Sequence, residues 1–256
     1  MRYQSTTGLT NDQLVELVVG IYHVGDYRRK RTGRREILGL YAQVVLTLVV
    51  LRQNLAQTVL ADLFGISQPT VSRIVRRILP LIAEVVSSWG CTLPEVITDR
   101  VVLVDGTLIP TGNRAHTGRQ NYSGKHRQQG LSVQVASDLT GQLLAVSDPV
   151  PGARHDAAAL RLTGWEHILS PANWIGDRAY TATTAITPIK KPHYQELPPD
   201  HQEFNRALAA LRNPVERCIA HLKNWKMLAT GYRGRLSELP TIIRIVTQCE
   251  FYRLGR

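Results

Sequence analysis

Residues 101–106 read VVLVDG, and this stretch decides the fold class. An apolar, valine-rich run that ends in Asp105-Gly106 predicts a buried strand followed by a turn. Three later runs have the same texture: LSVQVASD (131–138), QLLAVSD (142–148) and NWIGD (173–177). DLTG (138–141) joins the first two runs and is a tight-turn signal, so they are predicted to form a hairpin. From about residue 96 we therefore expect an α/β domain.

The first hundred residues instead predict a succession of helices. Thr10-Asn11-Asp12 precedes a periodic apolar run, which is a helix start signal. The apolar stretch at 38–51 is short for a membrane span and predicts a buried helix. We expect an all-helical domain at residues 1–95 and an α/β domain at 96–256, whose texture returns to helical after residue 199.

The charge balance favours a polyanionic partner. The formal net charge is +11 and the pI is about 10.0, and nucleic acid is the commonest polyanion that such a protein meets. Most of the basic residues are arginine, which suits bidentate contact with phosphate, although a GC-rich genome would give the same bias. The run YRRKRTGRR (27–35) is interpreted as a loop that contacts phosphate, with a solvated loop as the alternative.

The remaining composition indicates the compartment. Cys91, Cys218 and Cys249 are far apart and lack CxxC spacing, so neither a disulfide framework nor a zinc site is expected. The first residues have no apolar core for a signal peptide. We expect a soluble cytoplasmic protein, associated with the nucleoid and with no membrane partner.

Residues 57–76, QTVLADLFGISQPTVSRIVR, have the pattern of a helix-turn-helix, which we place at about 57–79. Ala61 is small where the two helices cross, and Gly65 stands where the turn needs a positive φ. Ser67 can cap the second helix and Pro69 suits its first turn. Two helices packed in a core would show the same spacing, but the second helix carries residues that can reach base edges or phosphates. These are Gln68, Thr70, Ser72, Arg73, Arg76 and Arg77.

Three carboxylates stand at the ends of predicted elements. Asp105 ends the strand in VLVDGT, Asp177 ends the strand in WIGDRAY, and Glu216 lies on the helix of NPVERCIAHLK. Two-metal cleavage of a phosphodiester needs carboxylates from separate elements that converge on one point. The sequence therefore predicts a catalytic and metal-binding triad of Asp105, Asp177 and Glu216.

Each of the three also has an ordinary explanation. Asp105-Gly106 is a common turn dipeptide, and Asp177 could close a strand beside Arg178. Glu216 could simply belong to a helix start, with Asn213 as N-cap and Pro214 as the first helical residue. The cap and metal roles of Glu216 are compatible, because a carboxylate near a helix N-terminus stays ionised.

The sequence resembles the DDE transposases of bacterial insertion sequences in the insertion-sequence-five group, which are similar to Harbinger-type transposases (DDE superfamily endonucleases). The resemblance covers nearly the whole chain. It runs in order through these segments: LVVLRQNLAQTVLADLFGISQPTVSRI, VDGT, YSGKH, VPGARHDAAAL, GDRAY and RNPVERCIAHLKNWKML. In that family the two aspartates and the glutamate of these motifs bind the catalytic Mg²⁺, which implies this role for Asp105, Asp177 and Glu216. The family's catalytic domain is ribonuclease H-like, a mixed sheet flanked by helices.

Several further residues belong to the matched motifs. Lys223 is the downstream basic residue, two turns after Glu216 on the same helix, and Arg212 precedes it; both could contact DNA phosphate. Lys125 and Arg127 in SGKHRQQG are expected near the substrate DNA, with a solvent-facing basic turn as the alternative. His155 and Asp156 have no assigned role beyond possible support. Asp156 is interpreted as the N-cap of the Ala-rich helix after it in preference to a metal ligand.

The resemblance implies an insertion-sequence transposase. It would hydrolyse DNA at terminal inverted repeats and transfer the 3′-hydroxyl ends into target DNA, with two Mg²⁺ ions that Mn²⁺ could replace. Its partner would be double-stranded DNA, bound by a dimer or a higher oligomer that pairs two ends. The alternatives are a DDE nuclease that cuts without joining, a domesticated non-catalytic regulator, and a ribonuclease H-type enzyme acting on RNA hybrids.

Overall fold

The computed structural model describes residues 4–25, 36–112, 119–194 and 196–255. The basic run at 27–35 lies outside these residues. By their internal contacts the described residues form two compact units. Unit 1 comprises those of Met1–Gly90, Lys223–Tyr232 and Thr241–Arg256, and unit 2 those of Cys91–Leu222 and Arg233–Pro240. None of the described helices is long and apolar enough to cross a membrane.

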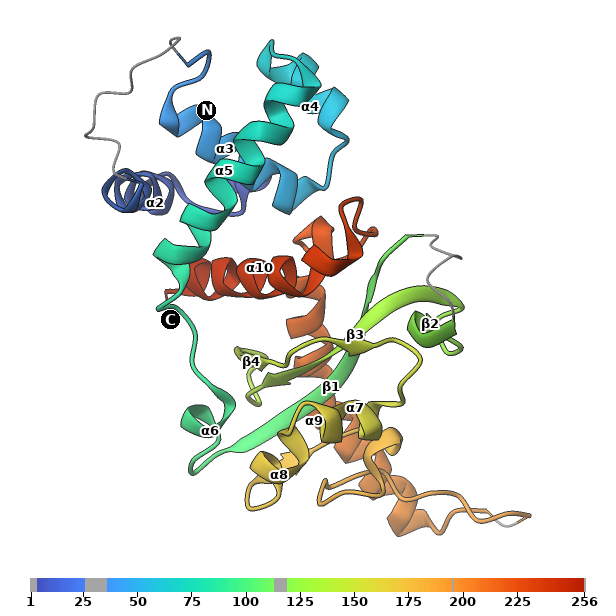
Figure 1. Cartoon of the computed structure of the whole chain (residues 1–256). Helices are drawn as coiled ribbons and strands as arrows, with labels where there is room; N and C mark the ends of the chain where they lie inside the picture. Colours follow the sequence, from blue (N-terminus) through green and yellow to red (C-terminus); the bar gives the residue numbers. More distant parts are fainter. Residues whose placement is uncertain (1–3, 26–35, 113–118, 195, 256) are drawn as a thin grey trace. The chain divides into compact units, whose positions relative to one another are not determined.

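Unit 1 is helical, as predicted (Figure 1). Its elements are α1 (Gln4–Thr7), α2 (Asn11–Val24), α3 (Leu40–Gln53), α4 (Gln57–Phe64), α5 (Gln68–Val86), the 3₁₀ turn η4 (Lys226–Leu228) and α10 (Leu239–Leu254), whose first two residues belong to unit 2. The predicted helix start before α2 is confirmed, because Thr10 is the N-cap and forms a capping box with Gln13. The apolar stretch at 38–51 forms most of α3, and its residues 43–51 are buried, as predicted.

The end of the chain packs into unit 1. Trp225 is fully buried and donates a hydrogen bond of 2.7 Å from Nε1 to Glu250 of α10. The guanidinium of Arg52 lies 5.1 Å from the centroid of the Trp225 ring, a cation–π contact. These compact units are defined by internal contacts. The predicted domains are defined by function, a DNA-binding domain at 1–95 and a catalytic domain at 96–256, and that division stays a prediction.

The helix-turn-helix predicted at about 57–79 forms from α4 and α5. Gly65 ends α4 with φ of +63°, the left-handed conformation expected for the turn. Ser67 is the N-cap of α5, but its hydroxyl bonds the Thr70 hydroxyl at 2.9 Å instead of a backbone N–H. Pro69 lies in the first turn of α5, as predicted.

Unit 2 is a mixed sheet between helices, and this α/β architecture confirms the coarse fold prediction. The strands are β1 (Val101–Pro110), β2 (Tyr122–Ser123), β3 (Gln128–Ser137), β4 (Leu143–Val146), β5 (Val150–Pro151) and β6 (Asn173–Ile175). The order is β2-β3-β1-β6, with β4 and β5 also paired to β3. β3 is antiparallel to each of its partners, and β1 is parallel to β6. The hairpin predicted at 138–141 is present between β3 and β4.

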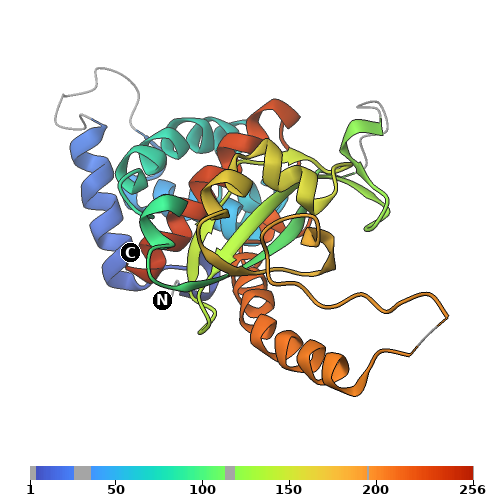
Figure 2. The same cartoon turned by 90° about the horizontal axis from the view of Figure 1, so that it is seen from below.

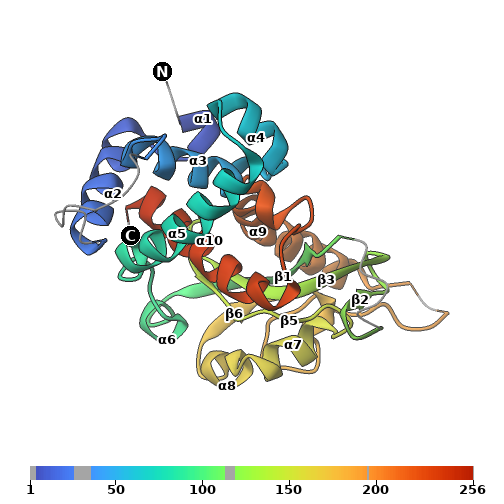
Figure 3. The same ribbon diagram turned by 45° about the horizontal axis from the view of Figure 1, so that its top comes forward.

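Helices cover both faces of the sheet (Figure 3). They are α6 (Leu93–Val96), α7 (Asp156–Leu162), α8 (Trp165–Leu169) and α9 (Pro199–Leu222), with 3₁₀ turns η2 (Arg119–Asn121), η3 (Arg178–Tyr180) and η5 (Leu236–Glu238). Val102 and Val104 of β1 pack against α6, α7 and α8, whereas Leu103 between them packs against α9. This alternation is the period-two pattern of a strand buried on both faces. Figure 2 shows α9 as the long orange helix, reached by the extended segment that follows β6.

The helix start predicted at Asn213 is wrong. α9 runs without interruption from Pro199 to Leu222, and Pro214 lies inside it. Proline cannot donate a backbone hydrogen bond within the helix, which costs stability. Leu208 and Val215, on either side of the proline, are both buried against Leu103 and Ile175 of the sheet, and this packing holds the helix together through the proline.

Candidate active site

The prediction that Asp105 ends its strand is wrong. Asp105 lies in the middle of β1, paired with Val135 of β3, whereas Asp177 follows the end of β6 by two residues. Leu103 of β1 pairs with Ile175 of β6. Two residues further along each segment, the chain reaches Asp105 and Asp177, so the pairing of β1 with β6 brings the two carboxylates together where β6 ends. The negative charge of Asp177 acts on the pKa of Asp105, which agrees with this proximity.

Asp105 is a buried carboxyl group with a raised pKa. Its pKa is raised to about 6, and burial is the largest cause. The charges of Asp177 and Asp156 also raise it, whereas Arg212 and a 3.0 Å hydrogen bond from the Gly106 N–H lower it. Arg212, on α9, places Nη2 3.6 Å from Asp105 Oδ1. Both side chains are less than a fifth exposed, so solvent screens this ion pair only weakly.

Asp156 joins this group from the other face of the sheet. The interpretation of Asp156 as an N-cap is wrong, because His155 is the N-cap of α7 and Asp156 is the first helical residue. Its carboxylate lies instead against Gly106: a Cβ added there would stand 2.3 Å from Asp156 Oδ1. The absence of a side chain at Gly106 therefore lets Asp156 approach β1 directly beside Asp105. Burial raises the pKa of Asp156, Lys125 opposes that effect, and the charge of Asp177 adds to it.

Tyr180 and Gln134 form a buried hydrogen-bonded pair beside the carboxylates. The buried Tyr180 hydroxyl donates a short hydrogen bond to Gln134 Oε1. Burial and the charges of the three aspartates hold the pKa of Tyr180 well above its usual value, so the phenol remains a donor. Gln134 is fully buried, and its Nε2 has no hydrogen-bond partner among the described residues. An added Cβ at Gly106 would lie 3.3 Å from this nitrogen and 2.3 Å from Asp156 Oδ1.

Neither Gln134 nor Tyr180 was predicted to have a role. The available signal was an amide side chain in an otherwise largely apolar strand, at 131–136, together with the tyrosine of GDRAY. A buried polar side chain needs a partner, so both were candidates for a polar network. Their pairing could not be read from spacing, because 46 residues separate them.

Glu216 lies on α9, one turn after Arg212. Residues four apart are neighbours on a helix surface, so the Asp105–Arg212 ion pair fixes the stretch of α9 that carries Glu216 beside β1. The Glu216 side chain itself is exposed, and the described charges with the largest effect on Asp105 are Arg212, Asp177 and Asp156. The structure thus gathers Asp105, Asp156 and Asp177, and it leaves Glu216 at the edge of the group.

The carboxylates suit a divalent cation in chemistry and charge. Carboxylate oxygens are the ligands that Mg²⁺ prefers, and two buried aspartates with raised pKa values are stabilised in their charged form by a nearby cation. Over the described residues, however, no three His, Cys, Asp or Glu side chains converge closely enough to form a ready metal site. Arg212 and Lys125 supply the positive charge next to the carboxylates in this arrangement.

The residues predicted to contact DNA from the helix-turn-helix differ in exposure. Gln68, Arg73 and Arg76 are exposed on α5, and Thr70 and Ser72 are half-buried. Arg77 was predicted to be exposed, but it is engaged within unit 1: its Nη1 lies 2.7 Å from Glu36 Oε1, and its Nη2 donates to Gln43. The reason is that Arg77 sits beside α3, where Gln43 is buried among apolar residues and needs a partner.

The other predicted DNA contacts lie on segments that follow strands or helices. Lys125 and Arg127 are exposed between β2 and β3, and Lys125 Nζ lies 3.7 Å from Asp156 Oδ2. Lys223 was predicted on the same helix as Glu216, but α9 ends at Leu222 and Lys223 belongs to unit 1. Burial lowers the pKa of Lys223.

Two segments of the chain match known protein families. Residues 104–251 match the family model described as "DDE superfamily endonuclease", and residues 38–88 match "Helix-turn-helix of DDE superfamily endonuclease". Nucleases of this superfamily generally use divalent metal ions. No solved structure matches the chain significantly.

Two curated proteins are similar over most of the chain. One, from Streptomyces albus G, is named "Putative transposase for insertion sequence element IS112"; it is 31% identical over 225 residues, which are 87% of this chain and 83% of that protein. The other, from Microchaete diplosiphon, is named "Probable transposase for insertion sequence element IS702"; it is 26% identical over 249 residues, 91% of this chain and 87% of that protein.

Proposed function

Because the chain belongs to the DDE superfamily endonucleases, we propose that it is the transposase of an insertion sequence. It cuts DNA at terminal inverted repeats and joins the freed 3′-hydroxyl ends to target DNA. The catalytic domain in this proposal is ribonuclease H-like. Its support is the central β1 with an antiparallel β3 on one side and a parallel β6 on the other, covered by helices on both faces.

The observation that carries the proposal is the meeting of Asp105 and Asp177 where β6 ends beside β1, with α9 tied to Asp105 by Arg212. We assign Asp105, Asp177 and Glu216 as the ligands of two Mg²⁺ ions, for which Mn²⁺ can substitute. When bound, such ions activate the attacking oxygen and stabilise the leaving oxygen of the phosphodiester. Glu216 completes the set from α9, since its neighbour Arg212 already reaches Asp105.

The remaining residues bind and position DNA. Gln68, Arg73 and Arg76 are exposed on α5 and suit contact with the base edges and phosphates of a terminal repeat. Arg212 stands beside the carboxylates, where its guanidinium can hold a phosphate oxygen. Pairing of two element ends requires a dimer or a higher oligomer on DNA.

The first test measures nicking of a supercoiled plasmid that carries the genomic DNA flanking the coding sequence. We expect nicking with Mg²⁺ and none with EDTA. Asp105→Asn and Glu216→Gln remove a ligand charge and abolish nicking, while DNA binding through the helix-turn-helix persists. Asp99→Asn is the matched control, because Asp99 is an exposed aspartate with φ of +56°, a conformation that asparagine tolerates.

The second test separates joining from cutting. A labelled, pre-cut end with a free 3′-hydroxyl is incubated with a target plasmid, and the labelled joined product is measured. Joined product that depends on Asp105 supports a transposase. Nicking without joining would indicate a nuclease, and nicking unaffected by Asp105→Asn would contradict the assignment of the site.

A further inference from the structure

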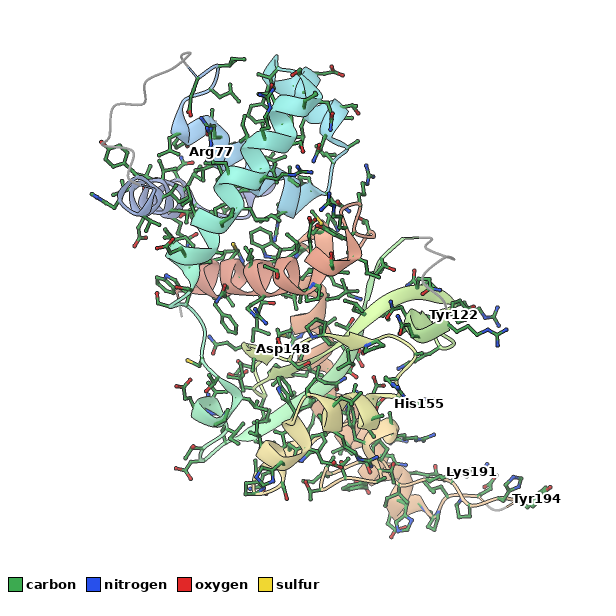
Figure 4. All side chains as sticks on the ribbon, in the orientation of Figure 1. Arg77, Tyr122, Asp148, His155, Lys191 and Tyr194 are labelled. Atoms are coloured by element: carbon green, nitrogen blue, oxygen red, sulfur yellow. The ribbon has the colours of Figure 1, made fainter. Side chains whose placement is uncertain are left out.

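A cavity of about 120 Å³ adjoins the carboxylates in unit 2. Its walls come from four segments: the middle of β1, the end of β2 with the turn after it, Ser132 of β3, and the segment that leads into α7. Gly106 and Asp156 belong both to this cavity and to the group around Asp105. A ligand in the cavity therefore lies immediately beside the candidate active site. Figure 4 labels His155, one of its lining residues, between β2 and α7.

The ionisable side chains that line the cavity are mostly basic. Lys125 and His126 come from the turn after β2, and Arg154 and His155 from the segment before α7. The only carboxylate among the described lining residues is Asp156. Two permanent positive charges and two imidazoles against one carboxylate favour an anion with several oxygen acceptors.

Lys125 is available for such an anion. Its ion pair with Asp156 is 3.7 Å long, and the lysine side chain is 66% exposed. Exposed ion pairs of this kind contribute little to stability, so Lys125 can move to a stronger partner at small cost. The anion would then replace Asp156 as the partner of Lys125.

Glycine keeps the floor of the cavity close to the strands. A Cβ at Gly152 would lie 2.5 Å from the Gly130 oxygen and 2.8 Å from a methyl carbon of Leu108. Only glycine therefore lets the segment that carries Arg154 and His155 lie directly on the sheet. This close approach holds the segment against the cavity that Arg154 and His155 line together with Asp156.

We propose that the cavity binds the phosphate of the cut strand that neighbours the scissile phosphate, which we call the flanking phosphate. This inference rests on the proposed function, because it takes the scissile phosphate to lie at Asp105 and Asp177. A DNA strand presents its next phosphate one nucleotide away, and the shared residues Gly106 and Asp156 put the basic cavity on that path. Lys125 and Arg154 hold the flanking phosphate and so fix the register of the strand at the carboxylates. The described lining contains no Phe, Tyr or Trp on which a flipped base could stack.

The test combines protein variants with DNA in which single phosphates are replaced by uncharged methylphosphonates. The probe is a duplex from the flanking genomic DNA that spans the mapped nick. Binding is measured in Ca²⁺ for wild type, Lys125→Met and Arg154→Met. The matched control is Lys191→Met, an exposed lysine on the segment before α9 that is not among the described residues lining the cavity.

We expect one methylphosphonate, next to the nick, to weaken wild-type binding about five- to tenfold, roughly the effect of one lost charged contact. Lys125→Met should bind the unmodified duplex more weakly than wild type by the same factor. In this variant the same methylphosphonate should not weaken binding any further. Lys191→Met behaves as wild type.

The outcomes separate the inference from the proposed function. If wild type nicks through Asp105 but no methylphosphonate near the nick shows coupling to Lys125 or Arg154, the flanking-phosphate site is wrong and the proposed function stands. If coupling appears but Asp105-dependent nicking does not, the proposed function fails and the cavity remains a phosphate site. Coupling to removal of a base, in place of a phosphate charge, would overturn the proposal in favour of a nucleobase pocket.

Discussion

Arg212 Nη2 lies 3.6 Å from Asp105 Oδ1, and this ion pair ties helix α9 to the central strand at the group of buried carboxylates. Asp105 would carry a still higher pKa without that cation, since burial and two neighbouring aspartates all oppose its ionisation. The site is therefore electrostatically strained in the absence of further positive charge, which has measurable consequences.

We predict that Asp105→Asn stabilises the metal-free protein at neutral pH. The folded-state pKa of about 6 is above the ordinary value of 3.8, so the folded protein binds the proton more tightly, and stability falls as the pH rises from about 4 through 6. Asparagine removes that cost. Urea unfolding in EDTA should show a gain of about 2 kcal/mol at pH 7.5, at about 1.4 kcal/mol per pKa unit less the lost Arg212 contact. At pH 4 the gain should vanish. Destabilisation at both pH values would contradict the raised pKa.

Gly106→Ala should disrupt the site by displacing Asp156. The new Cβ would stand 2.3 Å from Asp156 Oδ1, so the carboxylate or the strand must move. We expect a loss of about 1–3 kcal/mol in the free energy of unfolding, as for other overpacked positions, and loss of nicking with DNA binding retained. Combining Gly106→Ala with Asp156→Ala relieves the contact, so the double variant should be less destabilised than the sum of the two single variants. Additive losses would show that Asp156 is not the obstacle.

Tyr180→Phe should destabilise unit 2 by removing the donor to Gln134. The buried Oε1 of Gln134 would lose the hydrogen bond that this hydroxyl donates, at a cost of about 1–3 kcal/mol. Adding Gln134→Leu removes the stranded amide and should recover part of the loss. Chemical denaturation of the two single variants and the double variant tests this, and a double variant as unstable as the sum would refute the pairing.

Asp138 should stabilise the β3–β4 hairpin in its charged form. Burial alone would raise its pKa, but hydrogen bonds from Thr140 and Gln142 outweigh burial and lower it. A lowered folded-state pKa gives stability that is complete above the unfolded value near 4 and is lost as the pH falls through the folded value. Asp138→Ala should therefore cost about 1 kcal/mol at pH 7 and less at pH 3, measured by urea unfolding. An equal cost at both pH values would exclude a role for the charge.

Arg76 and Arg77, adjacent on α5, should affect different properties. Arg76 is exposed, so Arg76→Met should weaken DNA binding and reduce the slope of log affinity against log salt by about 1. Arg77 bonds Glu36 and Gln43, so Arg77→Met should lower the free energy of unfolding by about 1 kcal/mol, with little change in that slope. Fluorescence anisotropy across a salt series distinguishes them. Equal slopes for the two variants would mean that Arg77 also contacts DNA.

The local elements were readable from sequence because their causes are local. The apolar start of β1 at residue 101, the hairpin turn at 138–141 and the left-handed Gly65 each depend on a few adjacent residues. The turn expected at Asp105-Gly106 failed, because pairing with β3 continues β1 through both residues to Pro110. The helix start expected at Asn213 failed for a non-local reason: burial of Leu208 and Val215 against the sheet outweighs the preference of Pro214 for a first turn. The N-cap expected at Asp156 failed for a similar reason: its carboxylate packs instead against Gly106 of β1, a residue distant in the sequence.

The sequence by itself determined the helical and α/β regions, the helix-turn-helix, the family, and the two aspartates that follow apolar strand segments. Those depend on periodicity, turn chemistry and residue order, which are properties of neighbouring residues. Only the tertiary structure decided which charges meet. Parallel pairing of β1 with β6 brings Asp105 beside Asp177, the bare backbone at Gly106 admits Asp156, and packing of α9 delivers Arg212. Electrostatic interactions act through space, so no spacing along the chain could specify them.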